Sequence, residues 1–256
     1  MKYIFIDFDG TIMDSHNGLI PKSTFEAIAL LQEKGHQVII TTGRNIFLLE
    51  EYPRLLNIHW VSGSNGRFLT KDLIHLEYQD PIPSEAVKDL IKTLRNHQID
   101  YVLSTHNAYV THQKYGSSID LFSEHFKMLY PEIKQDFDDY NHIFQINVFS
   151  NQPIPQEVLK STPLSFLRAS HHGYDVTMGT ALKEKTLAYV EKSMGLSRED
   201  IIAIGDGLND KGMIQYAGTG IAMGNASDEV KQVADYVTDS IENDGLIKAF
   251  KHFNLI

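Results

Sequence analysis

The fold is decided by the stretch Tyr3-Ile4-Phe5-Ile6-Asp7-Phe8-Asp9-Gly10-Thr11. Its unbroken apolar run predicts a strand that is buried on both faces, as in a parallel sheet. In open parallel α/β sheets the chemistry lies beyond the carboxyl ends of the strands, where Asp7 and Asp9 would emerge. Residues i and i+2 of a strand share one face, so we expect both carboxylates to face one crevice. A strand followed by an ordinary Asp-Gly turn is the alternative.

The composition is that of a globular protein that works without thiol chemistry. The chain has 256 residues, no cysteine and 42% hydrophobic residues. Disulfides and thiolate metal sites are therefore excluded. No signal peptide and no membrane-spanning run is visible, so we expect a cytoplasmic protein. The net charge of -10 argues against general nucleic-acid binding, and an anionic substrate would have to be met by locally placed cations.

A second buried strand is expected at residues 37–41, after a helix whose apolar residues recur at helical spacing. Strand, helix and strand in this order predict a βαβ unit with parallel pairing. The second strand ends in Thr41-Thr42-Gly43-Arg44. Hydroxyl and backbone N–H groups can bind phosphate oxygens without adding charge. Two threonines that simply favour a strand end are the alternative.

Another buried strand, at residues 200–204, runs into Gly205-Asp206-Gly207-Leu208-Asn209-Asp210. Its two carboxylates stand where a strand ends and a helix begins, so they can flank one cation. Hard oxygen ligands suit Mg²⁺, and the pattern of a calcium-binding loop is absent.

The middle of the chain has a different pattern of predicted helices and strands from its two ends. From Pro81 onward the sequence predicts an amphipathic helix, short strands, a helix at 117–127 and a closing hairpin formed by residues 165–170 and 174–178. We therefore expect an α/β protein with a Rossmann-like parallel-sheet core, residues 1–81 and 179–256, and an inserted α+β domain, residues 82–178. The histidines of this segment are expected to be solvated or hydrogen-bonded rather than metal ligands: His97, His106, His112, His125, His142, His171 and His172.

Four motifs follow one another along the chain. They are Asp7-Phe8-Asp9-Gly10-Thr11, then Thr42-Gly43-Arg44, then a lysine that opens a helix, and last Gly205-Asp206-Gly207-Leu208-Asn209-Asp210. This order resembles the four motifs of the haloacid dehalogenase-like superfamily, in its Cof-type phosphatase subfamily with a type IIB cap. The resemblance covers about 1–80 and 175–250 by motif and the middle by position and texture. It implies that residues 82–178 form the cap.

The resemblance also implies a role for each motif position. Asp7 would be the nucleophile and Asp9 the general acid and base. Mg²⁺ would be held by Asp7, the backbone carbonyl of Asp9, Asp206 and Asp210. The phosphoryl oxygens would be held by Thr42, Gly43, Lys183 and Asn209, with Arg44 and Asn65 near the substrate.

Two of these assignments leave an alternative open. Thr41 is the second choice for the hydroxyl. Lys185 is the second choice for the lysine, because relatives usually have glycine where this chain has Glu184.

The function that the resemblance implies is Mg²⁺-dependent hydrolysis of small phosphate esters, such as sugar phosphates, flavin nucleotide or pyridoxal phosphate. Two other functions compete with it. A phosphotransferase or phosphomutase would move the group to an acceptor, and a non-catalytic phospho-ligand sensor would only bind it. A receiver-type sensor needs neither Asp9 nor a large inserted domain, and this chain has both.

Overall fold

The computed structural model describes residues 1–46, 49, 51–112, 119–120, 131–150, 152–170, 173–179 and 183–256. The chain forms two compact units. The first comprises Met1–Arg44, Leu49–Gln79 and Ala181–Ile256, and the second comprises Asn45–Leu48 and Asp80–Thr180. Most of the helix predicted at 117–127, together with His125, His171 and His172, lies outside the described residues.

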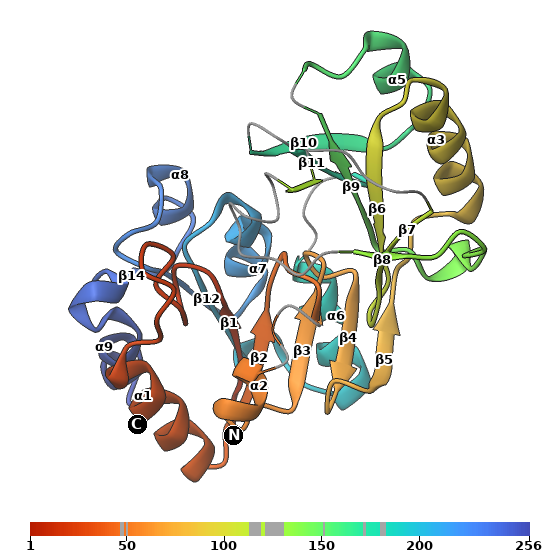
Figure 1. Ribbon diagram of the computed structural model, residues 1–256. Helices are drawn as coiled ribbons and strands as arrows, with labels where there is room; N and C mark the ends of the chain where they lie inside the picture. Colours follow the sequence, from red (N-terminus) through yellow and green to blue (C-terminus); the bar gives the residue numbers. More distant parts are fainter. Residues whose placement is uncertain are drawn as a thin grey trace. The chain divides into compact units, whose positions relative to one another are not determined.

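The first unit is built on an eight-stranded sheet with the order β14-β13-β12-β1-β2-β3-β4-β5 (Figure 1). The six strands from β14 to β3 pair in parallel: β1 (Tyr3–Asp7), β2 (Gln37–Thr41), β3 (Trp60–Gly63), β12 (Ile201–Gly205), β13 (Thr219–Ala222) and β14 (Tyr236–Val237). An antiparallel hairpin extends this sheet at one edge and consists of β4 (Phe68–Lys71) and β5 (His75–Gln79).

Helices pack on this sheet in pairs. On one face, α6 (Lys183–Met194) and α7 (Lys211–Tyr216) contribute to an apolar cluster that includes Phe5 and Ile39. Another pair in mutual contact is α1 (Lys22–Glu33), which also packs on β2, and α9 (Gly245–His252) (Figure 1). The shorter helices of the unit are α2 (Glu51–Leu55), α8 (Asp228–Lys231) and the 3₁₀ turns Arg198–Asp200, Leu208–Asp210 and Ile241–Asn243.

Strand β1 is the place where the order of the parallel strands reverses. The chain continues from β1 to β2 and β3 on one side, and later returns to β12, β13 and β14 on the other side. In open α/β sheets, ligands bind beyond the carboxyl ends of the strands at such a switch point. The ends of β1, β2 and β12 are therefore the part of the first unit in which to look for a site.

The second unit has a six-stranded, mostly antiparallel sheet with the order β10-β11-β9-β6-β7-β8. Its strands are β6 (Asp100–Ser104), β7 (Tyr109–Thr111), β8 (Glu132–Ile133), β9 (Gln145–Phe149), β10 (Ser165–Ser170) and β11 (Gly173–Thr177). Helices α3 (Ser84–Asn96) and α5 (Gln156–Lys160), with the 3₁₀ turn Tyr140–His142, complete the described part of the unit. Side chains of α3, α5, β6, β9 and β11 form its apolar core.

The α/β class and most strand predictions are confirmed, including β1, β2 and the β10–β11 hairpin. The β4–β5 hairpin was not predicted. Among the described histidines, His97, His112 and His142 are hydrogen-bonded as expected. In the described ranges no helix is long and apolar enough to cross a membrane.

Candidate active site

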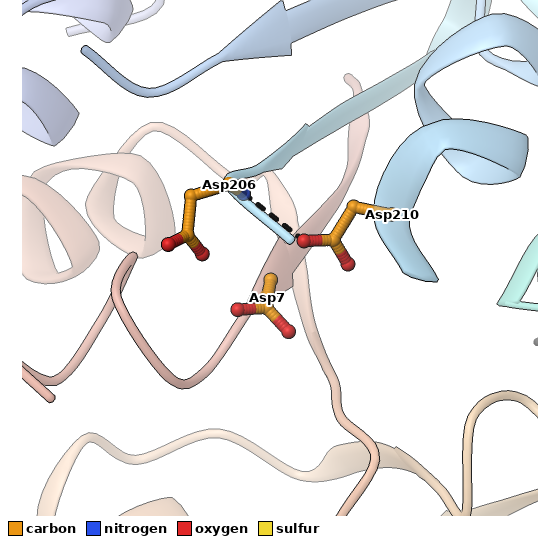
Figure 2. Close-up of side chains that lie close together, drawn as sticks. All are labelled: Asp7, Asp206 and Asp210. Atoms are coloured by element: carbon orange, nitrogen blue, oxygen red, sulfur yellow. Dashed lines mark hydrogen bonds between the residues drawn. The ribbon is translucent and has the colours of Figure 1, made fainter. Parts of the chain in front are cut away.

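Three carboxylates converge at the carboxyl end of the parallel sheet. Asp7 is the last residue of β1, Asp206 follows β12, and Asp210 ends the turn that precedes α7. One carboxylate oxygen from each lies within 4.8 Å of the other two. In Figure 2 the carboxylate of Asp7 lies between those of Asp206 and Asp210. Residues about two hundred positions apart thus meet because β1 and β12 are neighbouring parallel strands.

Asp210 shapes the loop that carries Asp206. Its Oδ2 atom accepts a hydrogen bond from the backbone N–H group of Asp206 at 3.0 Å (Figure 2). The same atom accepts a second one from the backbone N–H group of Gly207 at 2.8 Å. The loop approaches this side chain so closely that a Cβ atom at Gly205 would lie 2.5 Å from Asp210. Glycine is therefore required at that position by the close approach of the backbone.

Gly10 makes room for Asp206 on the other side of the group. The backbone of Gly10 has a φ of +85°, and a Cβ atom there would lie 2.2 Å from Oδ2 of Asp206. The carboxylate is held in this space by donors from two other segments. The Asn225 amide donates to Oδ2 at 3.0 Å, and the Thr11 hydroxyl donates to Oδ1 at 3.3 Å. Thr11 had no role in the sequence prediction, because nothing in a hydroxyl after Asp-Gly indicates a partner in the loop that follows β12.

Lys183 is the cation of this group. Its Nζ atom lies 2.5 Å from Oδ1 of Asp7 and 2.5 Å from Oδ1 of Asp210, and its side chain is fully buried. It also donates to the backbone carbonyl of Thr41 at 3.4 Å. A buried ammonium needs such acceptors because burial without partners strongly disfavours the charged form. The contacts to Asp7 and Asp210 therefore come from Lys183, not from the alternative, Lys185.

The ionisation of the group reflects this crowding. Burial, and then the negative charges of Asp210 and Asp206, raise the pKa of Asp7, although Lys183 opposes the shift. Burial and the charge of Asp210 raise the pKa of Asp206 to about 6. Burial alone would lower the pKa of Lys183, but the carboxylates of Asp210 and Asp7 outweigh it and raise this pKa. A cluster in which neighbouring carboxylates disfavour one another's charge can be stabilised by a cation.

The Asp9 carboxylate pairs with Arg44 and is not a member of this group, which differs from the expectation that Asp7 and Asp9 face one crevice. Its Oδ1 accepts from Nη2 of Arg44 at 2.5 Å, and its Oδ2 accepts from Nε of Arg44 at 2.9 Å. The reason lies in the backbone. Strand β1 ends at Asp7, so the rule that residues i and i+2 share a face no longer holds at Asp9.

The loops after β2 and β3 bring the remaining candidate residues together. The Thr42 hydroxyl accepts a hydrogen bond from the Arg44 backbone N–H at 3.0 Å. The Asn209 amide donates to Oδ1 of Asn65 at 2.9 Å, and a Cβ atom at Gly43 would lie 3.1 Å from that same oxygen. Asn65 thus connects the segment after β2 to the segment after β12.

A family model described as haloacid dehalogenase-like hydrolase matches residues 4–250. The chain is 34% identical to the protein YkrA of Bacillus subtilis over 259 residues, which cover 100% of this chain and 98% of YkrA. It is 30% identical to pyridoxal phosphate phosphatase YbhA of Escherichia coli over 265 residues, which cover 94% of this chain and 96% of YbhA.

Among solved structures, a sugar phosphatase of haloacid dehalogenase subclass IIB superposes with a TM-score of 0.81 at 29% sequence identity. The match covers 100% of both chains. The chain therefore belongs to the haloacid dehalogenase-like hydrolases. It is an enzyme of the phosphatase class, and the resemblance found in its motifs is confirmed.

Proposed function

We propose that this enzyme is a Mg²⁺-dependent phosphatase that hydrolyses small phosphorylated metabolites through an aspartyl-phosphate on Asp7. One observation carries the proposal: Asp7, Asp206 and Asp210 form a single carboxylate group at the switch point of the sheet. A fully buried lysine joins two of them. Positioning and charge compensation account for most of the catalysis of phosphoryl transfer.

The donor set fits Mg²⁺. The group offers hard carboxylate oxygens, and the chain has no cysteine that would favour a softer metal. Asp7, Asp206 and the backbone carbonyl of Asp9 would be ligands. Asp210 would act directly or through water, because its Oδ2 is already bound to two backbone N–H groups. When bound, the ion would offset the charge of the substrate's phosphoryl oxygens.

The chemistry that we propose moves the phosphoryl group in two steps. An oxygen of Asp7 attacks phosphorus as the bond to the leaving oxygen breaks, and Asp9 gives its proton to that oxygen. A water oxygen then attacks phosphorus, its proton passes to Asp9, and the bond to Asp7 breaks. Each residue thus ends in the state in which it began.

The phosphoryl oxygens would be held by the segments that surround Asp7. We assign this role to Thr42 and Gly43 after β2, to Lys183, and to Asn209. Arg44 and Asn65 would lie one contact further out. Lys183 supplies the local positive charge that a chain with a net charge of -10 needs to bind an anion.

We propose a small phosphate ester as the substrate, of the sugar phosphate, flavin nucleotide or pyridoxal phosphate type. The names of the subclass IIB sugar phosphatase and of YbhA support two of these types. Residues 82–178 would act as the cap that selects among them. We expect the enzyme to work in the cytoplasm, without a nucleic-acid or membrane partner.

The proposal is tested by measuring phosphate release from a panel of phosphorylated metabolites and an aryl phosphate, with Mg²⁺ and with EDTA. The wild-type protein should release phosphate only with Mg²⁺, and Asp7→Asn should release none while its unfolding curve stays cooperative. Asp228→Asn, an exposed carboxylate on α8, is the control and should keep full activity. Full activity of Asp7→Asn would exclude Asp7 as the nucleophile.

The same assay separates the competing functions. A phosphotransferase would need an acceptor sugar before the phosphoryl group left the donor, so phosphate release in water alone would argue against it. A sensor would bind the phosphate ester without turnover.

A further inference from the structure

Two nitrogen atoms of the Arg44 guanidinium donate hydrogen bonds to the two carboxylate oxygens of Asp9. Nη2 donates to Oδ1 at 2.5 Å and Nε donates to Oδ2 at 2.9 Å, so the two planar groups face each other edge to edge. Bidentate pairs of this kind fix direction as well as distance. Both side chains are about a third exposed, so solvent screens the ion pair. The pair therefore contributes more to the orientation of Asp9 than to the stability of the fold.

Arg44 is itself fixed on three sides. Its backbone N–H donates to the Thr42 hydroxyl at 3.0 Å, and its carbonyl accepts from the Ser64 N–H at 3.0 Å. Its guanidinium carbon lies 5.3 Å from the ring centroid of Phe8, the residue between the two aspartates. The arginine is therefore pre-organised by its surroundings, and Asp9 is the partner that its guanidinium contacts.

We propose that Arg44 is the positioning residue for Asp9, and that it acts on the reaction through Asp9 rather than by binding the substrate. The inference rests on the proposed function. A carboxylate has about four acceptor sites on its two oxygens, and the guanidinium fork uses two of them. The remaining sites of Asp9 stay open to accept a proton from water or to carry the proton for the leaving oxygen.

The competing role for Arg44 is direct binding of the phosphoryl group. The two roles predict different kinetics. An arginine that binds the phosphoryl group would stabilise the transition state of every substrate to a similar degree. Replacing it would therefore lower kcat further even in a variant that already lacks Asp9. Replacing an arginine that works through Asp9 would lower kcat most for leaving groups that need protonation. In a variant that already lacks Asp9, the same replacement would not lower kcat further.

The experiment is a kinetic double-mutant cycle with Arg44→Met, Asp9→Asn and the double variant, all assayed with Mg²⁺. Arg44→Met should lower kcat by about 100-fold with an alkyl phosphate, the scale of general acid–base catalysis, and by much less with an aryl phosphate. Measured with the aryl phosphate, the double variant should have the same kcat as Asp9→Asn alone. KM should change by less than about threefold throughout.

Two further variants sharpen the test. Arg44→Lys keeps the charge but cannot form the two parallel bonds, so its kcat should resemble that of Arg44→Met. Arg198→Met is the matched control, because Arg198 also lies over an aromatic ring, 4.3 Å from the centroid of Tyr216, but away from the site. It should keep the wild-type kcat with both substrates.

Equal losses with the alkyl and aryl phosphates, or losses that multiply in the double variant, would overturn the inference. So would a rise in KM with an unchanged kcat. These outcomes differ from a failure of the proposed function, in which the wild-type protein would release no phosphate or Asp7→Asn would remain active. Cooperative unfolding of each variant shows that a loss of turnover is not a loss of fold.

Discussion

The Nζ atom of Lys183 lies 2.5 Å from Oδ1 of Asp7, although 176 positions separate the two residues in the chain. The contact joins the end of β1 to the first residue of α6, so it connects the amino-terminal and the carboxyl-terminal segments of the first unit. Both groups are buried, and each compensates the charge of the other. The pair therefore contributes to folding as well as to any chemistry at the site.

Replacing Lys183 should be costly for this reason. Lys183→Met leaves buried carboxylates without their cation, and the free energy of unfolding should fall by about 3–5 kcal/mol, as for other broken buried pairs. Urea denaturation in EDTA measures the loss. Lys192→Met, at an exposed position of the same helix, is the control and should change the unfolding free energy far less. Equal decreases in the unfolding free energy of the two variants would show that the buried contact does not contribute more to stability than an exposed lysine does.

Gly10 and Gly18 offer a matched pair of substitutions. Both have positive φ, +85° and +72°, so alanine strains the backbone at either position by about 1–2 kcal/mol. At Gly18 a Cβ atom meets nothing within 4 Å, whereas at Gly10 it would lie 2.2 Å from Asp206. Gly10→Ala should therefore abolish Mg²⁺-dependent phosphate release, and Gly18→Ala should only lower the melting temperature. Retained turnover in Gly10→Ala would contradict the close approach.

Mg²⁺ should stabilise the folded protein. A ligand present at about 100 times its Kd adds about 2.7 kcal/mol to the free energy of unfolding. We therefore expect the melting temperature to rise on titration of the EDTA-treated protein with Mg²⁺. Asp206→Asn should remove most of this rise, and the exposed Asp228→Asn should keep it. A rise of wild-type size in Asp206→Asn would argue against Asp206 as a ligand.

The second unit should respond to pH through Asp175. Burial raises the pKa of Asp175 from its ordinary value of 3.8 to about 6, although the Asn147 and Gln145 amides oppose the shift. The folded state thus holds this proton more tightly than the unfolded chain does. Its stabilising effect is fully present below about pH 4 and is lost as the pH rises through about 6.

Replacing Asp175 checks this sign. Asp175→Asn cannot release a proton, so its unfolding free energy should fall less between pH 4 and pH 7 than that of the wild-type protein. Chemical denaturation at a series of pH values measures both slopes. Identical slopes would show that Asp175 does not contribute to the pH dependence.

Glu184 and Gly212 form a complementary pair between α6 and α7. A Cβ atom at Gly212 would lie 2.2 Å from Oε2 of Glu184, an oxygen that is buried without a hydrogen-bond partner in the described part of the chain. Gly212→Ala should destabilise the wild-type protein, but in a Glu184→Ala background it should be neutral or stabilising because alanine favours a helix. A coupling energy of about 0.5–3 kcal/mol is expected from the four unfolding curves, and a value near zero would exclude the contact.

The sequence predicted the elements whose residues are buried on regular patterns. Strands β1, β2 and β12 are continuous apolar runs that end in polar motifs, and a parallel sheet brings such ends together. This is why the sequence indicates that Asp7, Asp206 and Asp210 meet. The β4–β5 hairpin was missed because its edge strand β5 alternates between exposed and half-buried residues and has no buried residue.

Pairings that depend on side-chain direction could not be predicted. The choice between Lys183 and Lys185 depends on which side of α6 faces β1, and two residues of one helix look alike in sequence. The pairing of Asp9 with Arg44 depends on where β1 ends, a matter of one residue.

Asp210 serves two needs with one carboxyl group. One oxygen accepts from Lys183, and the other accepts from the backbone amides of Asp206 and Gly207. An asparagine in its place would turn one of those acceptors into a donor and leave either the ammonium or the two amides facing a repulsive group. The turn that precedes α7 thus requires a carboxylate at position 210 on structural grounds alone, so a loss of turnover in an Asp210 variant would not by itself identify Asp210 as a ligand of the proposed Mg²⁺ ion.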